Sequence, residues 1–199
     1  MRESDALGVR FEVASSQAEV EVFLSDLIRL HSQRWRSVGE RGTFAAPRFI
    51  DFHRAIAAQM VPNGQVFIAR LCEGARVVAV IYGFITGAKF EFYQSGVDTG
   101  PAAQLKRPGI LAHLLSMRYL SARGIANYDF LAGEAPYKLS LSTSQTRLAR
   151  LQLRRPGLRG LLGVAQEKVT VLFKKVLAKL TRPQAISNVR TLSVKGADL

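Results

Sequence analysis

Side chains that can move protons or bind an anion gather between residues 93 and 137 of this 199-residue chain. Glu134 carries a carboxylate that could act as a base, and the phenols of Tyr93 and Tyr137 could act as acids. Lys106 and Arg107 stand just before a segment with helical spacing, where the helix dipole also favours an anion. These residues are the first candidates for a catalytic site.

Each candidate also has a purely structural interpretation. Glu134 could be a surface carboxylate, the two tyrosines could be aromatic residues of the core or its rim, and the two cations could lie in a solvated loop. His31, His53 and His113 are too dispersed in the sequence to indicate a metal site. The first two share apolar helical faces, which is typical of packing residues, and we predict no metal.

The elements that must position these residues are a strand, a helix and a second strand. Residues 89–95 alternate as a strand does, and residues 109–123 have the apolar spacing of a helix. Gly124 can end that helix, and residues 127–132 follow as the next strand. Two strands connected in this way should be parallel, with a ligand site beyond their carboxyl ends and near the helix N-terminus.

The rest of the sequence predicts an α+β domain on a mixed, mostly antiparallel sheet. A first strand precedes two amphipathic helices, and Ser16 and Glu19 can form a capping box at the start of the first helix. Three antiparallel strands are expected between residues 65 and 95, and a last strand over residues 147–153. We assign residues 1–155 to this domain.

The basic charge of the protein is concentrated at its C-terminal end. Residues 138–199 carry 13 Lys and Arg against 2 Asp and Glu, a balance of +11, whereas residues 1–137 carry 15 against 13, a balance of +2. Residues 156–199 form a basic tail with an apolar stripe at helical spacing over residues 164–180. The stripe could pack on the domain or dock on an anionic membrane surface, and nucleic-acid contact is the weakest alternative.

The sequence also bears on the compartment of the protein. It has a single cysteine, Cys72, which excludes an internal disulfide framework and favours a reducing compartment. Its longest apolar run, residues 77–85, is too short to cross a bilayer. We expect a cytoplasmic protein, at most peripheral to the inner face of the membrane.

Residues 128–138, Tyr-Asp-Phe-Leu-Ala-Gly-Glu-Ala-Pro-Tyr-Lys, resemble the GNAT acyltransferase superfamily. The resemblance is to its Fem-type and cellulose-biosynthesis-type acetyltransferase domains, and it extends to residues 92–96, to residues 108–109 and to the order of elements. It implies that the two parallel strands splay around the pantetheine arm of acetyl-coenzyme A or another acyl-coenzyme A. The implied activity is transfer of the acyl group to an amine of an unknown acceptor.

The resemblance also implies roles for individual residues. The co-substrate would be bound by Gln94, Ser95, Lys106, Arg107, Gly109 and Ile110. Glu134 would deprotonate the amine, directly or through water, and Tyr137 or Tyr93 would protonate the departing thiolate. Asp129 and Lys138 would bind the acceptor.

The chain departs from the phosphate loop of the superfamily at one position. That loop has Arg or Gln, two residues, Gly, one residue, and then Gly or Ala. Read from Lys106, the chain has Gly109 in place but Leu111 where the small residue belongs.

Two other functions stay open. One is a Fem-type transfer of an amino acid from aminoacyl-tRNA to an envelope precursor, in which the basic tail would meet RNA. The other is a GNAT-like module that only binds. Fem-type enzymes usually have two GNAT-like halves and this chain holds about one, so a homodimer or a partner could supply the second half.

Overall fold

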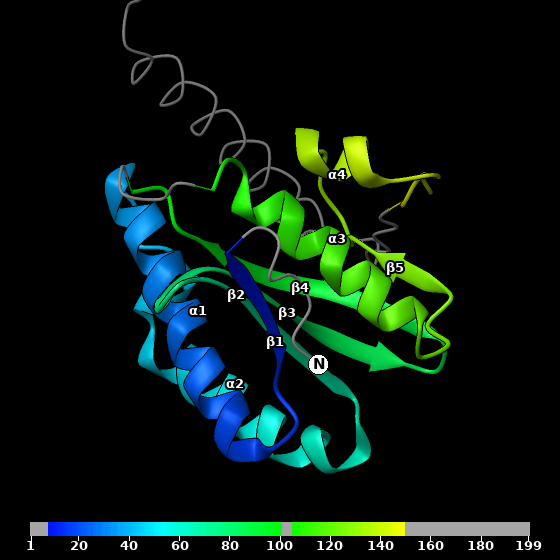
Figure 1. Cartoon of the computed structure of the whole chain (residues 1–199), viewed down its shortest axis with the longest axis horizontal. Coiled ribbons are helices and arrows are strands. Elements are labelled where there is room, and N and C mark those ends of the chain that lie inside the picture. The colour runs from blue at the N-terminus through cyan, green and yellow to red at the C-terminus, as the bar shows by residue number, and fades with distance from the viewer. Residues whose placement is uncertain (1–7, 101–104, 150–199) are drawn as a thin grey trace, which may run out of the picture. The chain divides into compact units, whose positions relative to one another are not determined.

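The structure is a computed structural model that describes residues 8–100 and 105–149 of the chain, which divides into two units after Ser144. The elements of the first unit are β1 (Val9–Val13), α1 (Gln17–Ser37), η2 (Thr43–Ala45), α2 (Pro47–Met60), η3 (Val61–Asn63), β2 (Val66–Glu73), β3 (Arg76–Thr86), β4 (Lys89–Val97), α3 (Pro108–Ser121), β5 (Asn127–Asp129) and α4 (Pro136–Leu141). The strands form one sheet in the order β1-β2-β3-β4-β5 (Figure 1). All neighbours are antiparallel except β4 and β5, which are parallel, so the predicted α+β class and mixed sheet are confirmed.

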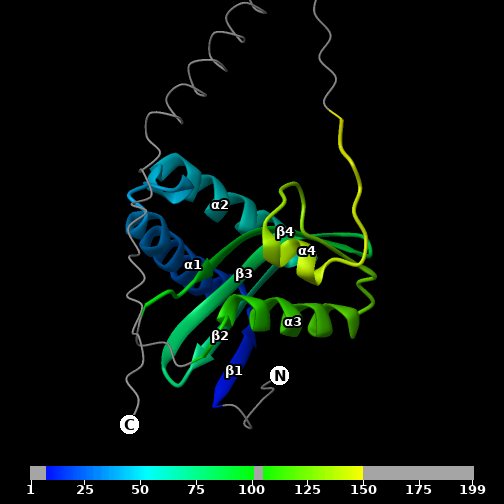
Figure 2. The ribbon, with the colours of Figure 1, turned by 90° about the horizontal axis from the view of Figure 1, so that it is seen from above.

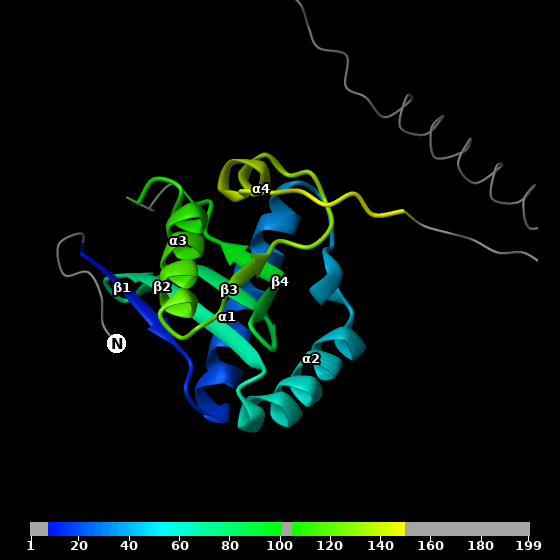
Figure 3. The same ribbon diagram turned by 90° about the vertical axis from the view of Figure 1, so that its right-hand side faces the viewer.

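Helices cover both faces of the sheet. Figure 2 and Figure 3 show α1 and α2 on one face and α3 on the other. Each face has its own apolar cluster, and residues 78–83 of the central strand β3 are all buried. A strand that is covered on both sides reads as a continuous apolar run, which explains why β3 does not alternate.

Helix α1 begins as the sequence predicts and lies directly against β4. The Ser16 hydroxyl accepts a hydrogen bond from the Glu19 N–H at 3.3 Å, and the Glu19 carboxylate accepts one from the Ser16 N–H at 3.2 Å. Gly96 of β4 permits the close approach, because a Cβ there would lie 2.8 Å from Leu30 Cβ and 3.0 Å from the carbonyl oxygen of Leu27. The C-terminal half of β4 is therefore fixed against a long, capped helix.

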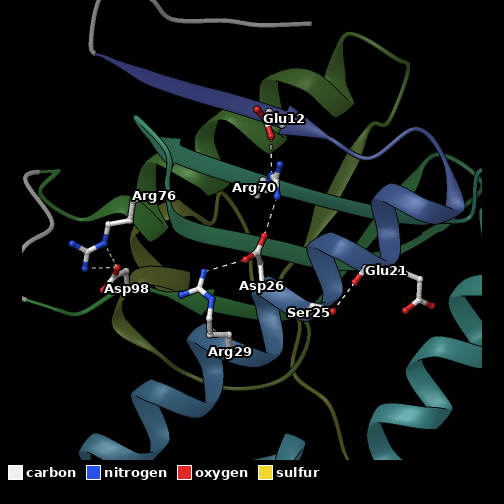
Figure 4. Close-up of polar contacts among 8 residues, drawn as sticks. All are labelled: Glu12, Glu21, Ser25, Asp26, Arg29, Arg70, Arg76 and Asp98. Carbon is white, nitrogen blue, oxygen red and sulfur yellow. Dashed lines mark hydrogen bonds and ion pairs between the residues drawn. The ribbon is translucent and has the colours of Figure 1, made fainter.

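An ion-pair network joins α1 to the opposite edge of the sheet (Figure 4). Arg70 of β2 lies 2.7 Å from a carboxylate oxygen of Glu12 on β1 and 3.0 Å from one of Asp26 on α1. Its guanidinium also stacks 4.2 Å above the ring of Phe23. Because the Arg70 side chain is only 22% exposed, this bridge is screened less than a surface ion pair.

Two strand predictions need correction. β5 ends at Asp129 and not at residue 132, because Leu131 adopts a left-handed backbone conformation with a φ of 56°. The Asp129 carboxylate accepts the Leu131 N–H at 2.7 Å and stabilises this turn away from the sheet. Residues 147–149 are not in a strand, and the rest of the segment predicted over 147–153 lies outside the described residues.

The C-terminal tail lies outside the described residues, so its helix over residues 164–180 and its docking stay predictions. The domain boundaries 1–155 and 156–199 stay predictions as well. Among the residues that the structure describes, no helix is both long and apolar enough to cross a membrane.

Candidate active site

The parallel strands β4 and β5 pair over only three residues and then part. Their register joins Lys89–Glu91 to Asn127–Asp129, after which β4 continues to Val97 beside β3 alone. Helix α3 begins next to the end of β4, as the close approach of Gly109 to Val97 shows: a Cβ on Gly109 would lie 3.0 Å from Val97 Cγ2. The open side of β4, the end of β5 and the N-terminal turn of α3 therefore adjoin one another.

β4 carries a bulge at Tyr93. Tyr82 of β3 pairs with Gln94, whereas the next residue, Gly83, pairs with Phe92, so Tyr93 has no partner on β3. Such an extra residue bends the strand and increases its twist. The bulge lies immediately beyond the part of β4 that pairs with β5.

Tyr93 and two buried histidines belong to the cluster on the α1–α2 face. The Tyr93 ring is 38% exposed and lies 4.9 Å from the ring of His53, which is fully buried and whose Nδ1 lies 3.2 Å from the Tyr82 hydroxyl. His31 is 3% exposed and accepts a hydrogen bond from Trp35 Nε1 at 2.9 Å. Burial lowers the pKa of both histidines, and they pack in the core as predicted. They are not fully satisfied, because His31 Nδ1 and His53 Nε2 are buried without a hydrogen-bond partner among the described residues.

The N-terminal turn of α3 has the features that an anion requires. Arg107, with a left-handed φ of 57°, precedes Pro108, and the first turn contains no acidic residue. The N–H groups of Ile110 and Leu111 bond to the Arg107 carbonyl at 3.0 and 3.4 Å, whereas the Gly109 N–H has no acceptor within the described residues. A phosphate placed here would meet that amide, the helix dipole and the exposed cation of Arg107.

Lys106 and Leu111 are the first and last positions of the predicted phosphate loop. Lys106 is exposed next to Arg107 and provides the second cation. Leu111 is half-buried and packs against the core cluster on the α3 face. The large residue at the unusual position is therefore accommodated by the core, and the turn fits the pyrophosphate that the resemblance implies.

A third histidine lies at the centre of an aromatic cluster where β4 and β5 part. His113 of α3 is 3% exposed, with its ring centroid 4.7 Å from that of Phe92, 5.2 Å from Phe130, 5.9 Å from Tyr128 and 5.5 Å from Tyr137. Its Nδ1 lies 2.8 Å from the Tyr128 hydroxyl. Burial, and to a smaller extent the nearby ammonium of Lys138 on α4, lower the pKa of His113 to about 4. Burial raises the pKa of Tyr128. The imidazole is therefore neutral, and it shares this hydrogen bond with the Tyr128 hydroxyl.

The family of the chain follows from a comparison of its sequence with models of protein families. The model of the acetyltransferase (GNAT) domain matches residues 1–139. The chain belongs to the GNAT acetyltransferase family. It is therefore an enzyme that transfers acyl groups, as predicted, whereas its place in the Fem-type or cellulose-biosynthesis-type branch stays a prediction.

Solved structures share this GNAT fold at low sequence identity. An aminoglycoside acetyltransferase from an uncultured soil metagenomic sample, in complex with sisomicin, is 13% identical, with 77% of this chain and 100% of that chain covered and a TM-score of 0.53. A GCN5-related N-acetyltransferase from Ralstonia eutropha JMP134 is 16% identical, with 75% and 99% covered and a TM-score of 0.51. No curated protein matches the sequence.

The two residues predicted to bind the acceptor make contacts within the protein. Lys138 Nζ donates to the carbonyl oxygens of Phe130 at 2.8 Å and Ala132 at 2.9 Å, and so ties α4 to the loop after β5. The Asp129 carboxylate lies 2.8 Å from Lys89 Nζ, and this contact lowers the pKa of Asp129. Both groups already have partners, and an acceptor would have to compete for them.

The structure places the other predicted site residues as follows. Glu134 is exposed and, among the described residues, has no hydrogen-bond or ion-pair partner. Tyr137 is half-buried on the α3 face, and burial raises its pKa. Gln94 Oε1 accepts the Ser95 N–H at 3.1 Å on β4. The two phenols predicted as acids belong to clusters on opposite faces of the sheet.

The sequence did not predict that His113 lies in the aromatic cluster where β4 and β5 part. From the sequence alone, this histidine was considered only as a metal ligand. Within residues 8–100 and 105–149, no three His, Cys, Asp or Glu side chains lie close enough together to hold a metal ion. A polar ring in an otherwise apolar helix segment was the available signal, but its aromatic partners come from β4, β5 and α4 and are invisible to local patterns.

Proposed function

We propose that this GNAT enzyme transfers an acetyl group from acetyl-coenzyme A to an amine. The observation that carries the proposal is the separation of β4 from β5 after Glu91 and Asp129, beside the start of α3. Backbone groups on an unpaired strand edge can hydrogen-bond an extended chain that contains amides, which is the chemistry of a pantetheine arm. Residues 92–97 of β4 offer such an edge.

The pyrophosphate would lie at the start of α3. The Gly109 N–H and the side chains of Lys106 and Arg107 are its donors. Ile110, predicted as a further donor, already bonds to the Arg107 carbonyl at 3.0 Å, so its amide contributes less. Gln94 and Ser95 would contact the arm from β4.

Two residues of the α4 region would move the protons. When bound, acetyl-coenzyme A supplies a thioester carbonyl that an amine can attack. Glu134, directly or through a water molecule, takes the proton that the amine loses, and Tyr137 gives its phenolic proton to the leaving sulfur. A bond forms between nitrogen and the acyl carbon while the bond from that carbon to sulfur breaks. We assign the acid to Tyr137 and not to Tyr93, because Tyr137 adjoins α3 and the end of β5.

Calorimetric titration with acetyl-coenzyme A tests this proposal, with desulfo-coenzyme A as a non-reacting ligand. We expect micromolar binding that Gly109→Glu abolishes, because the new carboxylate would lie beside the pyrophosphate. A matched set separates charge from packing: Gly109→Ala alone crowds Val97, whereas Gly109→Ala with Val97→Ala relieves that contact. The double variant and Val97→Ala should both bind.

Four results would contradict the proposal or redirect it. Unchanged binding by Gly109→Glu would place the ligand elsewhere, and no binding at millimolar ligand would exclude acetyl-coenzyme A as the donor. Salt-sensitive binding of aminoacyl-tRNA that is lost with residues 156–199 would then support the Fem-type alternative. Binding of neither would support a module without transferase activity.

The acceptor is defined only as an amine. One structurally similar protein is an aminoglycoside acetyltransferase solved with sisomicin, so we include amino sugars in the first acceptor screen beside amino acids and polyamines. Sedimentation of the full chain would show whether a homodimer supplies a second GNAT-like half.

A further inference from the structure

The contact between His113 and Tyr137 differs from every other ring contact of His113. The planes of these two rings are 19° apart, with centroids at 5.5 Å. Phe92, Tyr128 and Phe130 meet the imidazole at 79°, 81° and 65°. His113 is therefore the flat surface on which the phenol of Tyr137 lies.

Helix α4, which carries Tyr137, has few other contacts: Tyr137 and Leu141 pack against the core cluster on the α3 face, and the Tyr137 ring meets that of Phe130 at 6.1 Å. The helix is six residues long, has no buried residue, and its N-cap, Ala135, makes no side-chain hydrogen bond. Lys138 anchors the helix through the two carbonyl groups after β5. The orientation of Tyr137 depends on that anchor and on the surface presented by His113.

The imidazole itself is firmly fixed. Its Nδ1 shares a hydrogen bond of 2.8 Å with the Tyr128 hydroxyl on β5, and β5 is in turn paired with β4. A buried polar group without a partner would be costly, and this bond supplies the partner. The charged groups near Tyr137 are Arg34 of α1 and Lys138 of α4. The positive charge of Lys138 also disfavours protonation of the His113 imidazole.

We propose that His113 is a positioning residue for acyl transfer: held by Tyr128, its ring sets the plane of the Tyr137 phenol and directs the hydroxyl toward the gap between β4 and β5. This inference rests on the proposed function, in which Tyr137 protonates the leaving sulfur. An aliphatic side chain such as leucine would fill a similar volume but offer no rigid flat surface, so a histidine or another planar ring is required.

A double-mutant cycle tests the proposal in the full chain. His113→Leu should lower kcat by roughly tenfold to a hundredfold, as misplacement of a reacting group does, and leave KM for acetyl-coenzyme A within about twofold. In the Tyr137→Phe background the same substitution should have no further effect. Equal losses of kcat in both backgrounds would overturn the proposal, because His113 would then act independently of Tyr137.

His113→Phe separates positioning from stability. It removes the hydrogen bond between the Tyr128 hydroxyl and His113 Nδ1 and should destabilise the fold, yet it keeps a flat ring and should retain kcat within about threefold. Phe90→Leu is the packing control, because Phe90 is buried in the same cluster and contacts Tyr128 but, within the described residues, makes no ring contact with Tyr137. If His113→Phe and Phe90→Leu lost as much kcat as His113→Leu, the role would be structural.

A titration of Tyr137 reads the same contact without catalysis. With the tyrosine ring carbons labelled with ¹³C, NMR should show the raised pKa of Tyr137 returning toward its ordinary value in His113→Leu but not in His113→Phe. An unchanged pKa in His113→Leu would overturn the proposal. Because this measurement needs no acceptor, it tests whether His113 orients Tyr137 even if the wild-type protein transfers no acetyl group, which would be a failure of the proposed function alone.

Discussion

Acidification should destabilise the protein through its buried histidines, and His113→Phe isolates the contribution of one of them. His113 binds a proton in the unfolded chain with an ordinary pKa of about 6.5, but in the folded protein its pKa is lowered to about 4. Between these values the unfolded state binds more protons than the folded state. The free energy of unfolding therefore falls as the pH falls, and full stability is present only above the unfolded pKa.

The size of the effect follows from the two pKa values. Between about pH 7.5 and about pH 5, the linkage relation gives a loss of about 2 kcal/mol through His113 alone. His31 and His53 also have lowered pKa values because they are buried, and they add to the loss in the wild-type protein. The His113→Phe variant has a phenyl ring in place of the imidazole and cannot bind a proton there, so its stability should depend less steeply on pH.

Urea denaturation of wild type and His113→Phe at a series of pH values measures this difference. We expect the variant to be less stable at neutral pH and to lose about 2 kcal/mol less on acidification. Parallel pH profiles would refute the reasoning, since they would mean that His113 is protonated equally easily in the folded and unfolded states.

Three further predictions concern other contacts of the fold. Arg70→Met should lower the free energy of unfolding by roughly 1–3 kcal/mol, because it removes the shared partner of two half-buried carboxylates, Glu12 and Asp26. Arg54→Met, at an exposed pair with Glu21, should cost under about 0.5 kcal/mol; equal losses in urea denaturation would contradict this. Lys138→Met should lower kcat but not the affinity for acetyl-coenzyme A, since it releases α4, and a weakened affinity in calorimetry would argue against it. Leu131→Asn should raise stability by about 1 kcal/mol, because Asn tolerates the left-handed conformation; a lower melting temperature would count against that account of the turn.

Features set by neighbouring residues could be predicted from the sequence. The capping box of Ser16 and Glu19 depends on residues three apart, and Pro47 stands at the first turn of α2 because its fixed φ suits that position. Gly124 has a φ of 81°, as a residue that ends a helix requires. The strand–helix–strand unit followed from periodicity, and its location gave the region of the site.

Features set by distant residues could not be predicted. The bulge at Tyr93 exists only in the register between β4 and β3. The contacts of Lys138 with main-chain carbonyl groups depend on how the chain turns after β5, where Leu131 adopts a conformation that its own type disfavours. The stack of Tyr137 on His113 requires α3 and α4 to meet across the end of β5. Each contact joins elements whose relative placement no local pattern encodes.

We propose that this chain transfers an acetyl group to an amine with Tyr137 as the acid. The most direct test measures thiol release from acetyl-coenzyme A, with and without amines from the acceptor screen, for wild type and Tyr137→Phe. We predict amine-dependent thiol release by wild type and a loss of roughly a hundredfold or more in kcat for Tyr137→Phe, with binding of acetyl-coenzyme A retained. Undiminished release by Tyr137→Phe, or none by a wild-type protein that binds acetyl-coenzyme A, would contradict the account.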